Sequence, residues 1–193
     1  MFTGNPEGGA VGADGTVLTS DDAGGSWSQQ NGTISSDETW TAANSPYLLT
    51  GHLQIASGGS LTVDPGVEVD LNGYFILVVG TLRLEGTEAS KVSVSGSAAT
   101  SDGNYIHFKS SSVPYDTDTN TGSLIDHTNI NTDPVKPWES DYPPIDLDSA
   151  AKISNSTITS TKSGLYTAAG AIITNNIIKS GLQNGYGVRD PGS

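Results

Sequence analysis

The sequence repeats itself at a spacing of about twenty residues. Gly59-Ser-Leu-Thr-Val63 recurs 21 positions later as Gly80-Thr-Leu-Arg-Leu84, and Ile153-Ser-Asn-Ser-Thr-Ile158 recurs 20 positions later as Ile173-Thr-Asn-Asn-Ile-Ile178. Segment 125–130 has the same apolar spacing and lies 28 positions before 153–158. Matched segments at a nearly constant spacing indicate a chain built from stacked structural repeats.

Each repeat is made of very short strand-like segments. Apolar residues alternate with polar ones in pairs such as Leu53-x-Ile55, Leu61-x-Val63 and Val92-x-Val94, and Gly or Asn separates nearly every pair. A period of two is typical of a half-buried strand, and no window has helical periodicity of useful length. One coil of a parallel β-helix needs two or three such strands, because its coils stack about 4.8 Å apart and align equivalent residues in columns.

We therefore predict an all-β fold: a single-stranded right-handed parallel β-helix of about six or seven coils, preceded by a small N-terminal β-hairpin. Asn155 and Asn175 occupy matched positions, and we expect their side chains to form a stacking ladder between coils. An antiparallel β-sandwich is the alternative, since it also has short strands and Gly-rich turns. A sandwich gives no reason for matched segments at a constant spacing.

The composition divides the chain into two parts. Residues 1–33 are Gly-rich and contain one plausible hairpin, in which 16–19 and 26–28 flank a turn. This part is too small to have a core of its own, so we interpret it as a docking appendage. Residues 34–193 form the predicted β-helix. A loop insertion is expected at 131–144, because its four prolines cannot lie within a paired strand.

Segment 37–94 resembles the opening coils of right-handed β-helix proteins of the pectate-lyase-like superfamily. The residues that carry this similarity are Trp40, Pro46-Tyr47, Gly59 to Val67 and Gly80 to Leu82. The later segments "NSTIT" and "NNIIKSGL" resemble further coils of the same superfamily, so the similarity extends over about 35–188. Enzymes, surface adhesins and virus tail proteins share this fold, and the resemblance therefore implies a scaffold and leaves the activity open.

A second resemblance lies in the N-terminal part. Ser20-x-Asp22-x-Gly24-x-x-Trp27 is similar to the Asp-box, a β-hairpin in which aspartate and serine side chains bond the turn and the tryptophan packs beneath it. The resemblance implies a structural role for these four residues, since the box is not catalytic even in sialidases. Those enzymes use several boxes and an arginine triad, whereas this chain has one box and two arginines in all.

Charge and hydropathy exclude some classes of partner. The chain has 21 Asp and Glu against 8 Lys and Arg, a net charge of −13, and no cysteine. A phosphate-binding surface needs clustered Lys and Arg, so we expect no nucleic-acid partner. The longest apolar run, 74–79, is too short to cross a bilayer, and no charged and then apolar leader follows Met1. We therefore expect no membrane insertion. The chain either is not exported by a standard signal, is a piece of a longer exported protein, or assembles into a particle that leaves the cell by lysis.

Carboxylates and aromatic rings gather in and just after the 131–144 loop. Five of them form a candidate glycan- or partner-binding loop: Asp133, Trp138, Glu139, Asp141 and Tyr142. A solvated acidic loop and a glycosidase site are the alternatives. Asn131-Thr132-Asp133 resembles one element of polygalacturonases, but the other elements of that family are missing, and inverting hydrolysis needs both an acid and a base carboxylate. We therefore expect no catalytic residue.

The sequence offers few metal ligands. Asp116 and Asp118 are two positions apart and are candidates for opportunistic calcium binding, but the Gly and the twelfth-position Glu of an EF-hand are absent. His52, His107 and His127 are isolated in strand-like segments, and no cysteine, H-x-H or H-x-x-x-H pattern accompanies them. We expect outward-facing histidines, no transition-metal site and no cofactor.

Together these features predict a non-enzymatic structural or adhesive protein at a virion or extracellular surface. The more specific expectation is a bacteriophage virion component, namely a short fibre, spike or capsid-decorating protein. Such a protein forms a homo-oligomer, for which we favour a trimer, and docks on a larger assembly such as a capsid, tail or cell envelope. A fragment of a secreted bacterial or archaeal adhesin or envelope-layer protein is the alternative. A polysaccharide-binding or polysaccharide-degrading β-helix is the third.

Overall fold

The computed structural model describes residues 10–11, 17–18, 27–96, 102–137, 140–181 and 188–189. These residues form an all-β structure, in which one short 3-10 turn, η1 (Ala42–Asn44), is the single helical element. Among the described strands, β1 (Ala10–Val11) and β2 (Val17–Leu18) pair antiparallel, and all the other pairs of strands are parallel.

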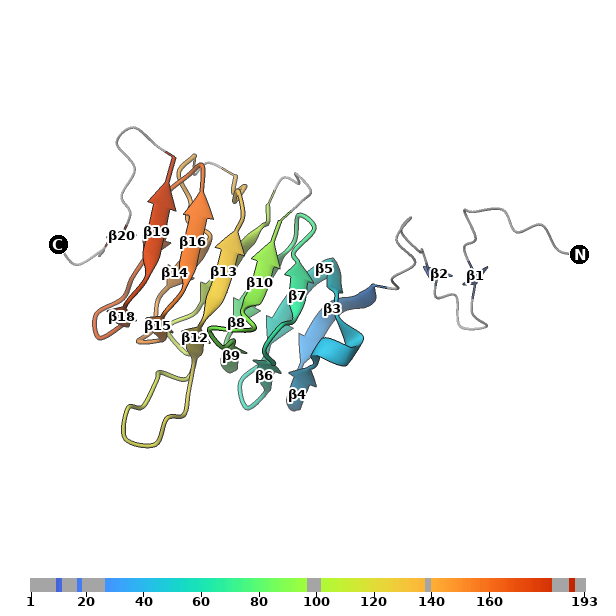
Figure 1. Ribbon diagram of the computed structural model, residues 1–193, viewed down its shortest axis with the longest axis horizontal. Helices are drawn as coiled ribbons and strands as arrows, with labels where there is room; N and C mark the ends of the chain where they lie inside the picture. Colours follow the sequence, from blue (N-terminus) through green and yellow to red (C-terminus); the bar gives the residue numbers. More distant parts are fainter. Residues whose placement is uncertain are drawn as a thin grey trace, which may run out of the picture.

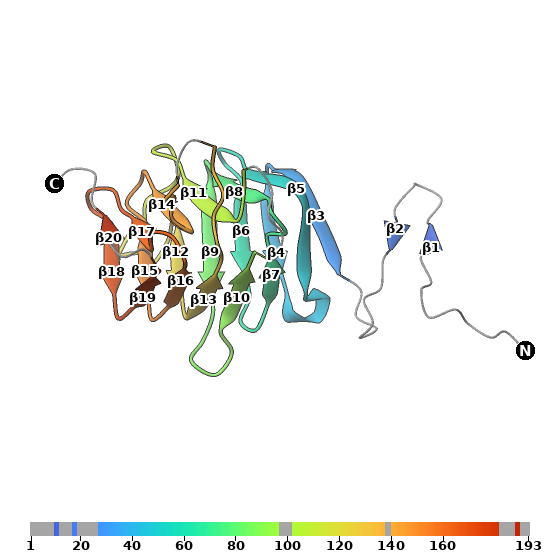
Figure 2. The same cartoon turned by 90° about the horizontal axis from the view of Figure 1, so that it is seen from above.

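The parallel strands lie in three columns along the length of the molecule (Figure 1, Figure 2). The first column contains β7 (Glu68–Asp70), β10 (Val92–Ser95), β13 (Thr128–Asn131), β16 (Thr157–Ser160) and β19 (Ile177–Ser180). The second contains β8 (Phe75–Val78), β11 (Tyr105–Phe108), β14 (Ile145–Leu147), β17 (Leu165–Tyr166) and β20 (Val188–Arg189). The third contains β4 (Asp37–Trp40), β6 (Ser60–Val63), β9 (Thr81–Glu85), β12 (Leu124–Asp126), β15 (Lys152–Ser154) and β18 (Ile172–Thr174).

The chain visits the third, first and second columns in that order and then begins again one level further along. The long strand β5 (Tyr47–Ile55) joins the first two columns, because its start pairs with β7 and its end pairs with β8. Strand β3 (Ser28–Ile34) pairs along β5. The result is a 12-stranded sheet and a 6-stranded sheet that together nearly close around a common core, an arrangement compatible with a β-helix.

The strand registers confirm the spacing predicted from the repeats. Leu61 pairs with Leu82, 21 positions later, and Ile153 pairs with Ile173, 20 positions later. The 28-residue step also holds, since Ile125 pairs with Ile153. The extra length in that step includes the 131–144 loop, which connects β13 to β14 as expected.

The sequence did not predict a second insertion, residues 109–123, which connects β11 to β12 and projects beside the stack (Figure 1). Together with the longer connection between β10 and β11, it separates Arg83 from its register partner Leu124 by 41 positions. The segment turns back on itself through a bridge between Asp116 and Thr121. A polar Thr- and Asp-rich segment of this kind carries no period-two pattern, so the sequence shows it only as an interruption between repeats.

Inward-facing residues of every column form a continuous apolar core. The largest fully buried side chains include Leu61, Leu82, Phe108 and Ile125, and each such side chain contributes roughly 1.5–3 kcal/mol on burial. The alternation within strands follows from the pleat: Leu61 is buried while its neighbours in β6 are half-buried. Toward the C-terminal end of the stack, the apolar residues of β18 and β19 that pack against this core are only partly buried.

Glycine is needed at Gly80, where neighbouring coils approach each other closely. A side chain at Gly80 would place its Cβ 2.2 Å from the carbonyl oxygen of Gly59 and 2.3 Å from that of Ala56. These two contacts are with backbone atoms, which cannot move aside as a flexible side chain can. The matched glycines at 59 and 80 therefore mark the corner at which the second column passes into the third.

The strand pairing in the N-terminal part differs from the prediction. The sequence paired 16–19 with 26–28, but β2 pairs with β1, and Ser28 pairs with Tyr47 of β5. Because β3 begins at Ser28 and lies in the stack, the stacked part starts before the boundary expected at 33/34. The hydrophilic residues of β3 gave no period-two signal, so the parallel pairing along β5 could not be inferred from them.

Of the Asp-box residues, Ser20, Asp22 and Gly24 lie outside the described part of the chain. Trp27 is described and is half-buried next to the start of β3. The predicted role of this motif therefore stays a prediction.

Candidate functional site

Side chains that can bind or react gather on the outer face of the second column. His107 lies between Ile106 and Phe108, whose side chains are buried in the core, so the imidazole points outward. In register with it along the column lie Leu77 of β8 and Asp146 of β14. The stacking thus places a histidine directly beside a carboxylate that follows it by 39 positions.

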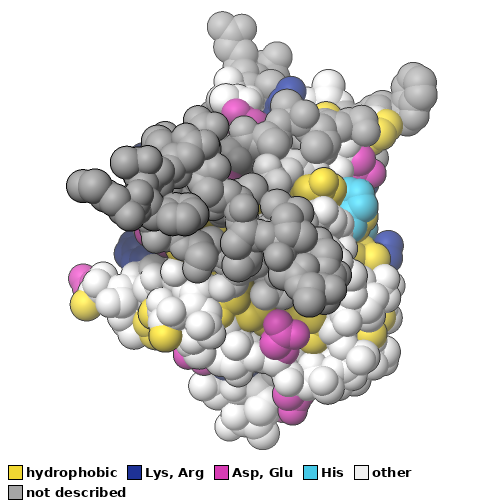
Figure 3. Space-filling model, turned by 90° about the vertical axis from the view of Figure 1, so that its right-hand side faces the viewer, with side chains coloured by type: hydrophobic (Ala, Val, Ile, Leu, Met, Phe, Trp, Pro, Cys, Tyr) yellow, Lys and Arg dark blue, Asp and Glu magenta, His cyan; other side chains and the backbone are white. Residues whose placement is uncertain are grey.

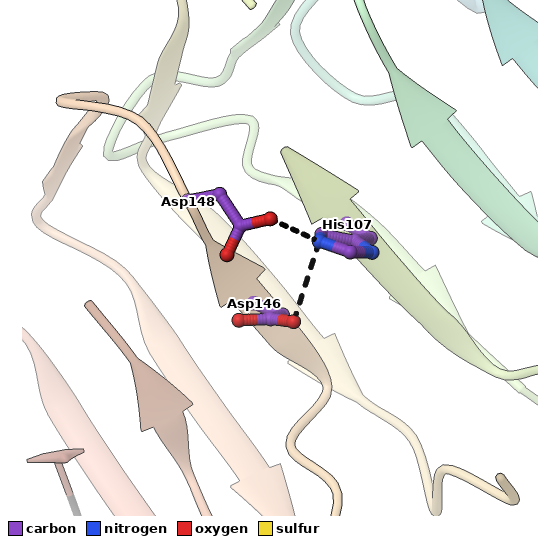
Figure 4. A group of neighbouring side chains, drawn as sticks. All are labelled: His107, Asp146 and Asp148. Atoms are coloured by element: carbon purple, nitrogen blue, oxygen red, sulfur yellow. Dashed lines mark hydrogen bonds and ion pairs between the residues drawn. The ribbon is translucent and has the colours of Figure 1, made fainter. Parts of the chain in front are cut away.

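A polar cluster forms where β11 meets β14 (Figure 4). Nε2 of His107 lies 2.9 Å from Oδ2 of Asp148 and 3.4 Å from Oδ2 of Asp146. The three ligand atoms lie within 4.8 Å of one another, the one such group of three that the described residues form. The side chains of His107 and Asp146 are 15% and 13% exposed, whereas that of Asp148, just past the end of β14, is 43% exposed. We call these three residues the His107 cluster.

Two neighbours hold the carboxylates of the His107 cluster. The hydroxyl of Tyr142 donates a hydrogen bond of 2.6 Å to Oδ2 of Asp146. On the solvent side, Nζ of Lys109 lies 3.6 Å from Oδ2 of Asp148. Asp146 is therefore fixed by a buried tyrosine, while the more exposed Asp148 is paired with a cation that is itself 43% exposed.

A row of aromatic rings continues along the same face. The ring of Phe75 stacks between His52 and Tyr105, with centroid separations of 3.9 and 5.2 Å. Tyr142 then meets Tyr105 edge to face at 4.8 Å and Tyr166 at 6.2 Å. Aromatic pairs in these geometries contribute about 0.5–1.5 kcal/mol each beyond the area they bury. The row therefore ties successive coils together on their outer side.

The predicted binding loop at 131–144 lies against this face. Tyr142 is 2% exposed, and Nζ of Lys136 sits 3.8 Å from its ring centroid, so the ring has no free face for a sugar. Oδ1 of Asp133 accepts a 2.7 Å hydrogen bond from the backbone N–H of Thr161. The backbone carbonyl of Asp141 accepts a bond of 3.4 Å from the hydroxyl of Tyr166. Trp138 and Glu139 lie outside the described residues.

The candidate calcium pair forms a turn. Oδ1 of Asp116 accepts hydrogen bonds from the backbone N–H groups of Asp118, at 2.8 Å, and Thr119, at 3.3 Å. These bonds hold the pKa of Asp116 below its ordinary value of 3.8, against a small opposing effect of burial. An aspartate that bonds the backbone two and three residues ahead is a turn-forming arrangement. Among the described residues, neither carboxylate joins a group of three metal ligands.

The predicted ladder residues meet at the ends of β15 and β18. Nδ2 of Asn175 donates to Oδ1 of Asn155 at 3.4 Å, and Nδ2 of Asn155 donates to Oδ1 of Asp126 at 2.8 Å. His127, Asn155 and Asn175 all have left-handed backbone conformations, with φ of 44°, 52° and 55°. Asparagine adopts this conformation more readily than other residues with a side chain. The row therefore forms a repeated corner of the stack.

Asp126 is the charged end of that corner. Its partial burial opposes ionisation, but hydrogen bonds from Ser154 Oγ, at 2.7 Å, and from Asn155, together with the neighbouring His127, outweigh it. The net result is a pKa for Asp126 below its ordinary value of 3.8. The carboxylate therefore stabilises the corner in its ionised form.

The sequence treated the three histidines as isolated, which is wrong in three dimensions. His107 meets Asp146 and Asp148, His52 stacks on Phe75, and Nδ1 of His127 lies 3.0 Å from Oδ2 of Asp126. The signal that would have found the His107 cluster is the register between β11 and β14. Two insertions interrupt the repeat there, so that register could not be read from a twenty-residue spacing.

Two shallow depressions also mark the described surface. One, of about 300 Å³, is lined by residues of β3, β5 and β8, among them His52, Gln54 and Leu77. The other, of about 380 Å³, has side chains of both charges, including Arg83, Glu85 and Lys152. In the view of Figure 3, acidic side chains are scattered over the surface, and one lies beside a histidine. Neither depression includes a residue of the His107 cluster.

No protein-family model, no curated protein and no solved structure matches this chain. Within the described residues, no helix has the length and apolar character needed to span a bilayer. The function of the chain is therefore inferred from its own sequence and from the geometry of its side chains.

Proposed function

We propose that this chain is a non-enzymatic structural or adhesive module of an exterior surface, built as a right-handed parallel β-helix of the pectate-lyase-like kind. The observation that carries the proposal is that its polar and aromatic side chains contact other parts of the same chain. Asp133 accepts a hydrogen bond from the backbone of Thr161, and Asn155 donates one to the carboxylate of Asp126. Tyr142 is buried. Side chains that a binding or catalytic loop would present to a ligand here hold neighbouring coils together.

The architecture suits a rigid spacer or adhesive rod. In a stacked repeat, each coil contacts only its neighbours, so length is added without a change in the core. The described depressions are shallow, and most enclosed small-molecule sites are deeper and bury most of the ligand surface. Broad, shallow surfaces fit an extended partner such as another protein chain or a glycan.

The specific form that we propose is a bacteriophage virion component, a trimeric short fibre, spike or capsid-decorating protein. The features that favour it are the absence of cysteine, the compact stack and the Gly-rich N-terminal segment. A module of a secreted bacterial or archaeal adhesin or envelope layer would have the same physical role. Neighbouring capsid or tail genes would favour the virion, and a signal peptide encoded upstream in the same gene would favour the cell surface.

Light scattering on the purified chain tests the assembly part of the proposal. We expect a solution mass about three times the chain mass of 19.8 kDa. A monomer at all concentrations up to about 100 µM would contradict the trimeric form.

The non-enzymatic part is tested with a panel of acidic and neutral polysaccharides. We expect neither new reducing ends nor the absorbance of unsaturated uronates after prolonged incubation. Cleavage that disappears in Asp133→Ala or Asp141→Ala, with Asp118→Ala as a control in a different loop, would overturn this part and favour a polysaccharide-degrading β-helix.

A further inference from the structure

We propose that the His107 cluster binds one divalent transition-metal ion of the zinc or manganese class. The donors are one imidazole nitrogen and the carboxylate oxygens of Asp146 and Asp148, and the remaining positions are open to water or to a group of a partner. Imidazole with carboxylates suits these metals, whereas calcium and magnesium favour sites made of oxygen alone. This inference does not rest on the proposed function, and it is an alternative to the sequence-based expectation of no transition-metal site.

The two distances from the His107 nitrogen to the carboxylate oxygens are close to those around such an ion. A metal about 2.1 Å from each donor, with angles of about 90–109°, places neighbouring donor atoms about 3.0–3.4 Å apart. The nitrogen of His107 lies 2.9 and 3.4 Å from the two carboxylate oxygens. A small movement of the exposed Asp148 side chain opens the 2.9 Å separation to the same range.

Without an ion, the imidazole cannot bond both carboxylates through the nitrogen that faces them. Nε2 of a histidine carries at most one hydrogen, but two carboxylate oxygens lie near it. The 3.4 Å separation from Asp146 is longer than the usual 2.7–3.2 Å of a hydrogen bond. A divalent cation between the three atoms would accept electron pairs from all of them at once.

The strands that carry two of the proposed metal ligands are held firmly in the stack. His107 and Asp146 are register partners on adjacent parallel strands, and the residues beside them in the chain are anchored in the core. Tyr142 orients the Asp146 carboxylate through its 2.6 Å hydrogen bond, as outer-shell groups commonly do for metal ligands. The ion would therefore link two coils that are already aligned.

Lys109 is the competitor of the metal. Its ammonium group lies 3.6 Å from the Asp148 oxygen and compensates part of the negative charge. Because this side chain is 43% exposed, it can move into solvent when an ion binds. Replacing Lys109 with Gln should therefore tighten metal binding, an effect that a purely structural ion pair would not produce.

Titration calorimetry of the chelator-treated full chain with zinc chloride at pH 7.5 tests the proposal. We expect one equivalent to bind, with at least tenfold weaker affinity in His107→Ala and Asp148→Asn and tighter affinity in Lys109→Gln. His52→Gln, a histidine of the same face outside the cluster, is the matched control and should bind as the unmodified chain does. Asp148→Asn changes an exposed side chain, so it keeps the test valid if His107→Ala fails to fold.

Cobalt substitution gives a second readout. Co²⁺ should produce visible d–d absorption that depends on His107, while calcium at the same concentration should not displace it. No saturable zinc binding up to about 1 mM would overturn the proposal and leave a histidine that lies between two carboxylates as a purely structural contact. Zinc binding that is unchanged in His107→Ala, or lost equally in His52→Gln, would overturn it as well.

Discussion

The side-chain amide of Asn175 donates a hydrogen bond to the side-chain carbonyl of Asn155, at 3.4 Å, from the coil next to it. Both residues have left-handed backbone conformations at the same corner of the stack. The bond joins residues twenty positions apart, and it continues from Asn155 to the carboxylate of Asp126. Corner geometry and inter-coil bonding are thus provided by the same side chains.

Replacing Asn155 should therefore lower the stability of the stack. Asn155→Ala loses its bond to Asp126 and puts alanine into a left-handed conformation, so we expect a loss of about 2 kcal/mol in the free energy of unfolding. Asn155→Gly keeps the backbone unstrained and should recover about half of that. Asn129→Ala, on the exposed side of β13, is the control. Equal melting of all three variants would contradict the role of this corner.

Asp126 should make stability depend on acid pH. Its folded-state pKa lies below the ordinary value of 3.8, so its contribution is complete well above that value and is lost as pH falls through the folded-state pKa. Asp126→Asn should be less stable by about 1 kcal/mol at pH 7, because it loses charge-assisted hydrogen bonds. The difference should shrink as pH is lowered from 5 to 3 in urea titrations.

A partial variant checks the cause of this pH dependence. Ser154→Ala removes one hydrogen bond to Asp126 and should give an intermediate slope of stability against pH. A difference between the unmodified chain and Asp126→Asn that stays constant from pH 7 to 3 would show that the carboxylate does not stabilise the corner in its ionised form.

Gly80→Ala should destabilise the stack strongly. Its Cβ would meet two backbone oxygens at 2.2 and 2.3 Å, and overpacking costs about 1–3 kcal/mol. Gly51→Ala is the control: its Cβ would lie 3.1 Å from one side-chain atom, Cβ of Asn31, so a shift of a few tenths of an ångström relieves the contact. We expect a change within about 1 kcal/mol there. Thermal unfolding followed by circular dichroism distinguishes the two, and equal melting temperatures would refute the close approach of coils at Gly80.

Tyr142 should control whether the 131–144 loop stays on the outer face. Tyr142→Ala removes a buried ring and should cost about 3–5 kcal/mol, with faster protease cleavage within the loop. Tyr142→Phe keeps the ring contacts but removes the bond to Asp146, so we expect about 1 kcal/mol and a protected loop. Cleavage that is as slow in Tyr142→Ala as in the unmodified chain would show that this ring is not the anchor.

The parts of the structure that sequence reasoning predicted are those with a clean period. The matches of Leu61 with Leu82 and of Ile153 with Ile173 rest on alternating apolar residues and a spacing free of insertions. The Asn155–Asn175 contact followed from the same spacing. At these positions the local apolar pattern agrees with the three-dimensional register, so the pairing can be predicted from the sequence.

The His107 cluster could not be predicted in this way. His107 precedes Asp146 by 39 positions, and two loops of different length lie between them. For Tyr142 the sequence suggested too much exposure. An aromatic residue in a proline-rich loop suggests an exposed ring that can bind a ligand, but packing against Tyr105 buries this ring. In both cases a tertiary contact between an insertion and a strand decided the outcome, and no local pattern encodes such a contact.

Cysteine cross-linking tests the stacking of coils most directly, because the chain has no cysteine of its own. Thr157 and Ile177 are register partners, and adjacent parallel strands lie about 4.8 Å apart, within the range of about 4.4–6.8 Å between Cα atoms that a disulfide needs. We expect Thr157→Cys/Ile177→Cys to cross-link on mild oxidation of the folded chain. Thr39→Cys/Ile177→Cys, with Thr39 on the first strand of the third column, should not. Cross-linking of both pairs to the same extent, or of neither, would contradict a chain that returns to the same face every twenty or so residues.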